Sequence, residues 1–319
     1  MMLGYLARGI VLVLAGHAIV STVAAVCIAW CWPRVTRQPV VVASRSANRL
    51  FLLRAAPTLA ALTVAWFGLA VSYALWEPRM GDERVGPVAL ALAGLGAAVL
   101  ISGVWRAWRA LRQSARIQQG LRMAARASQP RLPVPAVVID TGFPVVAVAG
   151  LFVPRLFVAH SVVEACTVEE IGAIVAHEHA HGAARDNLRR LALRGAPDVL
   201  AWTSAGPAIE RDWSVAAELA ADEVAARDGV GRLHLASALV KVARLAAAMP
   251  AATLPASALY RGEPIAERVR RLVEAPAGAA AVPPSWPPRV VALAVLAGAP
   301  LWMPAAYRAI ETILKIGLI

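Results

Sequence analysis

The sequence predicts a mainly α membrane protein that has about four transmembrane helices plus an α+β domain with a small sheet. Two properties of the 319-residue chain lead to this fold class: hydrophobic residues make up 59% of it, and yet its formal net charge is +12. A chain that is both apolar and strongly basic must keep its apolar and its arginine-rich segments apart. The third observation is that such segments do alternate along this sequence.

Four apolar runs have about the length that is needed to cross the hydrocarbon core of a bilayer. They cover residues 10–32, 55–76, 85–105 and 290–307, and the last is followed by a short tail to residue 319. The third run is rich in glycine and alanine, which favours close helix contacts in lipid. Pro300 and Pro304 favour a kink in the fourth.

A cleaved signal peptide is an alternative interpretation of the first apolar run, because Arg8 precedes it. The run is longer than a usual signal core and ends at Cys31, Trp32 and Pro33 rather than at a small-residue cleavage site. We therefore expect residues 1–105 to form three retained membrane helices.

Charges between the apolar runs predict the topology. Arginines without acidic residues separate the first two runs, whereas both signs of charge separate the second from the third. A second cluster of arginines follows the third run. Because cytoplasmic loops carry the excess of Lys and Arg, we expect the N-terminus outside and the region after residue 105 in the cytoplasm.

The arginines after residue 105 are also typical of a surface that binds nucleic acid. However, Trp105 and Trp108 lie among them, and aromatic and cationic side chains together are typical of a helix end at anionic lipid headgroups. The lipid bilayer is therefore the expected partner, and nucleic acid is not.

Residues 106–274 are long enough for one compact domain, and a proline-rich linker over 275–289 leads to the fourth run. Within this domain, short β-branched or apolar segments are separated by glycine and proline, which predicts a small, hairpin-rich sheet. The expected strands are Val134–Asp140, Val145–Ala149 and Leu156–His160.

A helix is expected to begin at Thr167, because Thr167 and Glu170 have the spacing of a capping box. Its last turns contain the pattern H-E-x-x-H, formed by His177, Glu178 and His181. From the composition of the chain, about 0.005 matches to this pattern are expected by chance.

Two imidazoles four residues apart share one face of a helix, so His177 and His181 can bind the same metal ion. This geometry is typical of Zn²⁺. Glu178 projects beside the metal, where it can take a proton from the attacking water, while His179 faces elsewhere. The alternative is a polar helix face whose histidines are solvated.

Glu218 is the expected third ligand, and Asp222 lies one helical turn beyond it, where it can orient a histidine. An ordinary amphipathic helix with a solvated acidic face is the alternative. The small apolar residues around this pair oppose it, because they favour close packing, and a buried acidic pair is costly without partners.

The H-E-x-x-H motif followed by E-x-x-A-D at residues 218–222 resembles the integral-membrane gluzincin metallopeptidases. The chain is most similar to the antibiotic-sensor peptidases of the BlaR/MecR type, and more distantly to the HtpX and Ste24 types. The resemblance implies a zincin-like metallopeptidase domain in which His177, His181 and Glu218 bind zinc and Glu178 is the catalytic base. The resemblance also includes Asp186, just after the first motif. We expect Asp186, like Asp222, to support a metal ligand without binding the metal itself.

The same resemblance implies a substrate-binding edge strand at Val145, Val146, Ala147 and Val148; a purely structural edge strand is an equal alternative. It also makes Arg268 a candidate donor to the oxyanion, although Arg268 could equally be a structural partner of Asp222 or Glu263. His160 and His234 are expected to be structural.

The expected function is that of a zinc metalloendopeptidase in a bacterial inner membrane. Its partner would be a cytoplasmic or membrane-associated protein or peptide substrate, with a transcriptional repressor as one candidate, and the sequence leaves a homo-oligomer open. The segment after Tyr307 is short, so no extracellular drug-binding domain is expected.

Two other classes of protein are alternatives to this function. A membrane signalling or scaffold protein would hold structural zinc with a fourth protein ligand and no open position. A metal transporter would usually need several ionisable groups in its spans, which here show few, such as His17.

Overall fold

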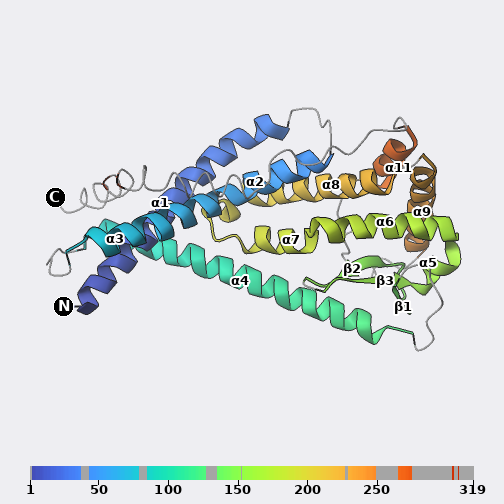
Figure 1. The fold of residues 1–319 in the computed structure, drawn as a ribbon, viewed down its shortest axis with the longest axis horizontal. Coiled ribbons are helices and arrows are strands. Elements are labelled where there is room, and N and C mark those ends of the chain that lie inside the picture. The colour runs from blue at the N-terminus through green and yellow to red at the C-terminus, as the bar shows by residue number, and fades with distance from the viewer. Residues whose placement is uncertain are drawn as a thin grey trace.

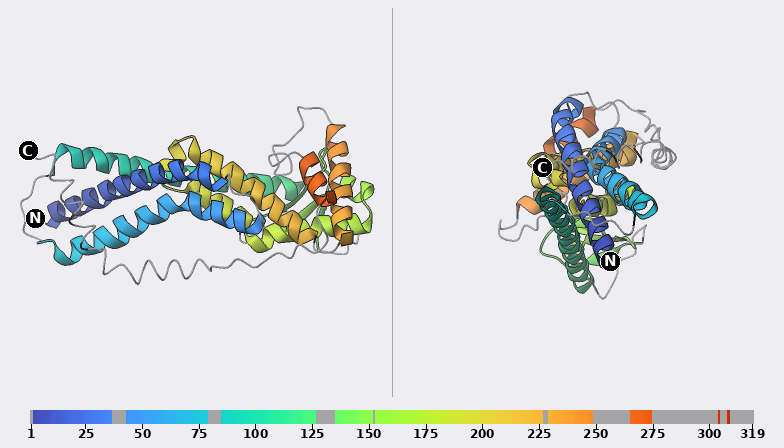
Figure 2. Two further views of the ribbon diagram at one scale, coloured as in Figure 1. Left: turned by 90° about the horizontal axis from the view of Figure 1, so that it is seen from above. Right: turned by 90° about the vertical axis from the view of Figure 1, so that its left-hand side faces the viewer.

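The computed structural model describes residues 2–36, 43–78, 85–126, 135–151, 153–226, 229–248 and 265–274, together with Pro304 and Arg308. The molecule is elongated, and most of it is helical (Figures 1 and 2). The N-terminus lies at one end, and the small sheet lies toward the other.

Three long apolar helices are candidates to cross a membrane. The first is α1 (Met2–Thr36), and the third is α4 (Pro87–Met123). The second is continuous from α2 (Ala43–Ala61) through a π-helical segment, η1 (Leu62–Leu69), to α3 (Ala70–Trp76). These helices contain the first two predicted spans and all but the first two residues of the third, whereas the predicted fourth span falls outside the described residues except for Pro304.

Glycine permits the close contact between α1 and α4. A Cβ atom at Gly96 would collide with the carbonyl oxygen of Leu14 on the facing helix. Only a residue without a side chain lets the two backbones approach so closely, which agrees with the close contacts predicted from the composition of the third span.

The sheet has three strands, β1 (Val137–Ile139), β2 (Val146–Ala149) and β3 (Arg155–Ala159), in the order β1-β3-β2. β1 and β2 lie within the predicted segments, whereas β3 begins at Arg155 and ends at Ala159, each one residue before the predicted bound. The prediction of a hairpin-rich sheet is only partly right, because β2 and β3 form an antiparallel hairpin while β1 pairs with β3 in parallel. Beside β2, the sheet has an open edge in the part of the chain that the structure describes.

Helices pack over one side of this sheet and extend from it along the long apolar helices (Figure 1). They are α5 (His160–Ala165), α6 (Val168–Ala184), α7 (Asp186–Gly195), a short 3₁₀ turn η2 (Val199–Trp202), α8 (Ala205–Ala225), α9 (Gly229–Ala247) and α11 (Ile265–Glu274). Apolar side chains of β2, β3, α6 and α9 form one buried core, so α6 lies against the sheet with a fixed face.

A second core joins two of the long apolar helices to α8. Ala25 of α1 and Leu50 of α2 pack in one buried cluster with Leu200, Ile209 and Trp213. The boundary expected between residues 105 and 106 is therefore not a break in the packing: α8 shares its core with the first two long helices.

A buried ion pair reinforces this contact. Arg54 of α2 and Asp198 are both fully buried, and the guanidinium Nη1 lies 2.9 Å from the carboxylate of Asp198. Arg54 also donates to Glu210 of α8 at 3.0 Å and to the carbonyl of Leu193 at 3.2 Å. Such a pair is held by several hydrogen bonds at once, which is the condition under which a buried charge is tolerated.

The segment between α7 and α8 is bound by all three long helices. His17 of α1 contacts the carbonyl oxygen of Pro197 at 2.9 Å, and Ser21 accepts a hydrogen bond from the amide of Val199 at 2.9 Å. From α4, Arg106 donates to the carbonyls of Arg194 and Ala196. This segment is consequently fixed to the membrane helices on several sides.

Candidate metal centre

The helix that carries the H-E-x-x-H motif begins as predicted. Thr167 Oγ1 accepts from the amide of Glu170 at 3.3 Å, and the Glu170 carboxylate accepts from the amide of Thr167 at 2.7 Å. The helix ends at Arg185, whose φ of 55° is left-handed. The chain turns there, and α7 begins at once with Asp186, so the first turn of α7 lies beside the last turn of α6.

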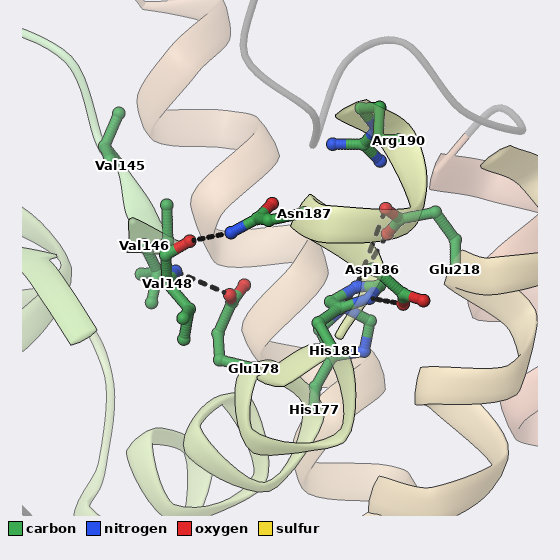
Figure 3. A pocket seen from close by; sticks show the side chains of 11 residues that line it. Val145, Val146, Val148, His177, Glu178, His181, Asp186, Asn187, Arg190 and Glu218 are labelled. Carbon is green, nitrogen blue, oxygen red and sulfur yellow. Dashed lines mark hydrogen bonds and ion pairs between the residues drawn. The ribbon is translucent and has the colours of Figure 1, made fainter. Parts of the chain in front are cut away.

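The structure brings the three predicted ligands together (Figure 3). The Nε2 atoms of His177 and His181 are 3.2 Å apart, and each lies 3.6 Å from an oxygen of Glu218. His177 and Glu218 are buried, while His181 is partly exposed. These residues come from α6 and α8, which pack against each other, so two helices suffice to form the cluster.

The donor set and its spacing fit zinc. Tetrahedral ligands about 2.1 Å from a zinc ion lie about 3.4 Å from one another, close to the 3.2 and 3.6 Å found here. Two imidazole nitrogens and one carboxylate oxygen are also a usual ligand set for this metal. A cation between them would relieve the repulsion of nitrogen lone pairs that face each other at such a distance.

Carboxylates lie behind both histidines. Asp186 Oδ2 is 2.8 Å from His181 Nδ1, and Asp222 Oδ1 is 3.0 Å from His177 Nδ1. Each contact favours a proton on Nδ1 and so leaves Nε2 free to bind a metal. Asp186 and Asp222 thus each contact a predicted ligand, and their supporting roles stay a prediction.

Arg268 lies behind the ligands rather than in the cavity. Its guanidinium makes two hydrogen bonds to Asp222, at 2.8 and 2.7 Å, and Nη1 is 3.3 Å from Glu218. The side chain is 2% exposed and does not line the cavity. Of the two roles predicted for Arg268, this position favours that of a structural partner of Asp222 over that of an oxyanion donor. The other predicted partner, Glu263, lies outside the described residues.

The carboxylates around the cluster create a negative electrostatic potential that favours positive charge. Burial alone lowers the pKa of His181, but Asp186 and Glu218 outweigh it and raise this pKa to about 10. Burial likewise opposes charge on His177, yet Asp222 and Glu218 raise its pKa. Although burial raises the pKa of Glu218, the two imidazoles hold it well below its usual range. A divalent cation would occupy this negative potential.

Glu178 points from α6 toward the sheet rather than toward the ligands (Figure 3). Its Oε2 atom accepts a hydrogen bond from the amide of Val148 on β2 at 2.9 Å. Burial raises the pKa of Glu178, and the neighbouring imidazoles of His177 and His181 only partly oppose this effect. His179 is exposed, as predicted, and takes no part in the cluster.

A cavity lies between the metal ligands and the open edge of β2. Most of its lining residues had a predicted role: the three ligands, Glu178, Asp186 and the four strand residues. Asn187 and Arg190 of α7 had none. The full lining is Val145, Val146, Ala147, Val148, His177, Glu178, His181, Asp186, Asn187, Arg190 and Glu218.

The register of the hairpin shows which backbone groups of β2 face this cavity. Val145 accepts from the amide of Ala159, so Val145, Ala147 and Ala149 are the residues that pair with β3. Val146 and Val148 alternate with them and direct their N–H and C=O groups to the open edge. Accordingly, Val148 donates to Glu178 and accepts from Asn187 Nδ2 at 3.0 Å.

The two other histidines of the domain lie elsewhere. His160 begins α5 and contacts Glu164 at 3.1 Å, and His234 lies within α9. Neither belongs to the metal-ligand cluster that the described residues form.

The three long apolar helices and the cluster of predicted ligands are consistent with a membrane-associated metallopeptidase. Residues 110–209 match the family model of Peptidase family M48, so a peptidase domain is present. The matched residues include the sheet, α6 and α7, and they end within α8 before Glu218. Neither the curated proteins nor the solved structures gave a match.

Proposed function

We propose that the protein is a membrane-embedded zinc metalloendopeptidase that cleaves a cytoplasmic or membrane-associated protein. One observation carries this proposal: the ligand cluster, the carboxylate of Glu178 and the open edge of β2 all line the same cavity. A metal, a proton acceptor and a strand that can pair with a peptide are the parts that hydrolysis of a peptide bond requires.

His177, His181 and Glu218 would hold the metal. When bound, zinc supplies a Lewis acid that acidifies water and polarises a peptide carbonyl. Among the described residues the cluster has three members, which leaves one tetrahedral position for solvent. The scaffold alternative would need a fourth protein ligand at that position.

Glu178 acts as the general base. Its burial raises its pKa toward the working pH, which suits a group that must first take and then return a proton. It removes a proton from the attacking water, and the same carboxyl group then protonates the leaving amine. The amide of Val148 holds one of its oxygens and so fixes the direction from which the proton is taken.

The substrate binds as an added strand along β2. The outward amide and carbonyl of Val146 are available for an extended peptide, whereas the corresponding groups of Val148 already bind Glu178 and Asn187. Backbone pairing does not depend on the substrate's side chains, so the site accepts a stretch of unfolded or extended polypeptide.

The arginine distribution supports a cytoplasmic position of this site in a bacterial inner membrane, with the N-terminus outside. A substrate would therefore be reached from the cytoplasm or along the membrane surface. A transcriptional repressor fits this description as one candidate.

A metal-retaining variant tests the function. The protein, purified in lipid nanodiscs, is compared with Glu178→Gln for bound zinc by mass spectrometry and for cleavage of a randomised peptide library. We expect one zinc in both proteins and cleavage by the wild type alone. His179→Gln, an exposed histidine of the same helix, is the matched control and should cleave normally.

Cellular substrates follow from the same pair of proteins. New N-termini in cells with the wild-type protein should be missing in cells with Glu178→Gln. Equal cleavage by the two zinc-loaded proteins would refute the proposed role of Glu178, and a zinc-loaded wild type that cleaves nothing in either experiment would refute the proposed function.

A further inference from the structure

The cavity contains one donor that the mechanism has not yet used. As water adds to a peptide carbonyl, negative charge develops on the carbonyl oxygen, and a fixed hydrogen-bond donor at that oxygen usually contributes strongly to the rate. With Arg268 bound to Asp222 behind the ligands, the donor must come from another residue.

Two side chains that line the cavity can donate besides the histidine ligands, namely Asn187 and Arg190. The Nδ2 atom of Asn187 already donates to the carbonyls of Val148 and Gly150, at 3.0 and 3.3 Å. Both of its hydrogens are therefore engaged in holding the β2–β3 hairpin. Arg190 remains.

Among the described residues, no carboxylate pairs with the guanidinium of Arg190. The arginines near it are engaged: Arg189 Nη1 lies 3.9 Å from Asp186, and Arg268 binds Asp222 and Glu218. Arg190 makes no ion pair with any residue in the described ranges, and its nearest aromatic contact is a distance of 5.7 Å from its Cζ to the ring of Trp213. A guanidinium that lines the cavity without an ion pair to a described residue can bind negative charge that develops there.

The position of Arg190 follows from the turn at Arg185. Arg190 lies four residues after Asp186 on α7, so the two side chains share one face of the helix. Asp186 on that face reaches His181, which directs the same face toward the ligands. Figure 3 shows Arg190 on the side of the cavity where Glu218 enters, away from β2.

We infer that Arg190 is a catalytic residue that stabilises the oxyanion formed during peptide hydrolysis, an inference that rests on the proposed function. Glu178 accepts a proton from water, the water oxygen forms a bond to the carbonyl carbon, and the π electron pair moves to the carbonyl oxygen, which accepts hydrogen bonds from Arg190. On collapse, the C–N bond breaks, and the amine takes the proton from Glu178. A guanidinium stays charged at every working pH and needs no activation for this role.

The test uses the full-length protein in nanodiscs and the quenched fluorescent peptide that the wild type cleaves fastest in a randomised library. Arg190→Gln should lower kcat about 10²-fold, the usual effect of removing one oxyanion donor, with KM, zinc content and melting temperature close to wild type. Arg190→Lys keeps the charge and should retain an intermediate kcat. Arg211→Gln, which removes an exposed arginine of α8, is the matched control and should behave as the wild type.

Chemical rescue distinguishes a direct role from a structural one. Added guanidinium should restore part of the activity of Arg190→Ala and should not restore that of Glu178→Gln. A wild-type kcat in Arg190→Gln, or a loss confined to KM, would overturn the role of Arg190 and leave the proposed function intact. A zinc-loaded wild type that cleaves no peptide would instead overturn both.

Discussion

Asn187 donates from Nδ2 to the carbonyl oxygen of Val148 at 3.0 Å and so ties the first turn of α7 to the open edge of the sheet. The residue before it, Asp186, contacts the ligand His181 at 2.8 Å. Two consecutive residues of one helical turn thus hold the proposed metal ligand on one side and the proposed peptide-binding strand on the other. This turn fixes the distance between His181 and the strand.

Asn187→Ala should weaken the alignment of β2 with the metal ligands. We expect kcat/KM to fall about fivefold, corresponding to a lost hydrogen bond of about 1 kcal/mol, mainly through a higher KM, while zinc stays bound. Steady-state kinetics and metal analysis measure both. Gln113→Ala, at an exposed position of α4, serves as the control, and equal kinetics in the two variants would contradict the role of Asn187.

Proline substitutions on β2 should separate substrate pairing from pairing within the sheet. Val146→Pro removes an amide that faces the open edge, so KM should rise about fivefold, corresponding to one lost hydrogen bond of about 1 kcal/mol. Ala147→Pro removes an amide that faces β3 and should lower the melting temperature more. Kinetics and thermal unfolding of both variants test this, and an unchanged KM in Val146→Pro would argue against strand addition.

Arg268→Met should destabilise the protein and weaken metal binding together. The variant leaves the buried carboxylate of Asp222 without its two hydrogen bonds, and breaking such a pair costs about 3–5 kcal/mol. Because Asp222 supports His177, zinc affinity should also fall about 10- to 100-fold. Thermal unfolding and competition with a chelator measure these effects. Arg270→Met, an exposed arginine of the same helix, should change neither.

Acid should destabilise the protein partly through Glu170. Burial alone would raise the pKa of this carboxyl, but hydrogen bonds from Lys241, Ser237 and the Thr167 amide hold it below its usual value. A carboxyl whose pKa is lower in the folded protein stabilises the fold above its unfolded pKa of 4.5, and this contribution is lost as the pH falls through the folded value.

Glu170→Gln should therefore lower the melting temperature at neutral pH and make it less dependent on pH between neutrality and about pH 3. Melting temperatures measured across this range give the result. Glu164→Gln, at an exposed carboxyl of α5, is the comparison. If Glu170→Gln retained the full acid sensitivity of the wild type, other groups would account for it.

Local signals explain which parts of the site could be predicted. The capping box at Thr167, the spacing of His177 and His181 and the turn between Glu218 and Asp222 each depend on one helix, so the sequence was enough to indicate them. The three strands were likewise indicated by short apolar runs between glycines and prolines.

Features that depend on contacts between distant segments were missed. Asn187 and Arg190 reach the cavity because Arg185 adopts a left-handed conformation. The sequence around Arg185 does not predict this conformation. The i+4 spacing from Asp186 to Arg190 was a usable signal once that turn was known. The parallel pairing of β1 with β3 joins segments that are distant in the sequence, and so does the ion pair of Arg54 with Asp198. No local sequence pattern predicts such contacts.

Residues Leu193–Trp202 are bound by the long helices, which limits how the domain that contains the cavity can be expressed without them. A fragment that begins after α2 would leave Asp198 and Glu210 without Arg54, and it would uncover the apolar side of α8 opposite Glu218. The first two long helices are thus part of the scaffold that shapes the cavity as well as its tether, and the smallest unit that keeps the cavity intact includes them.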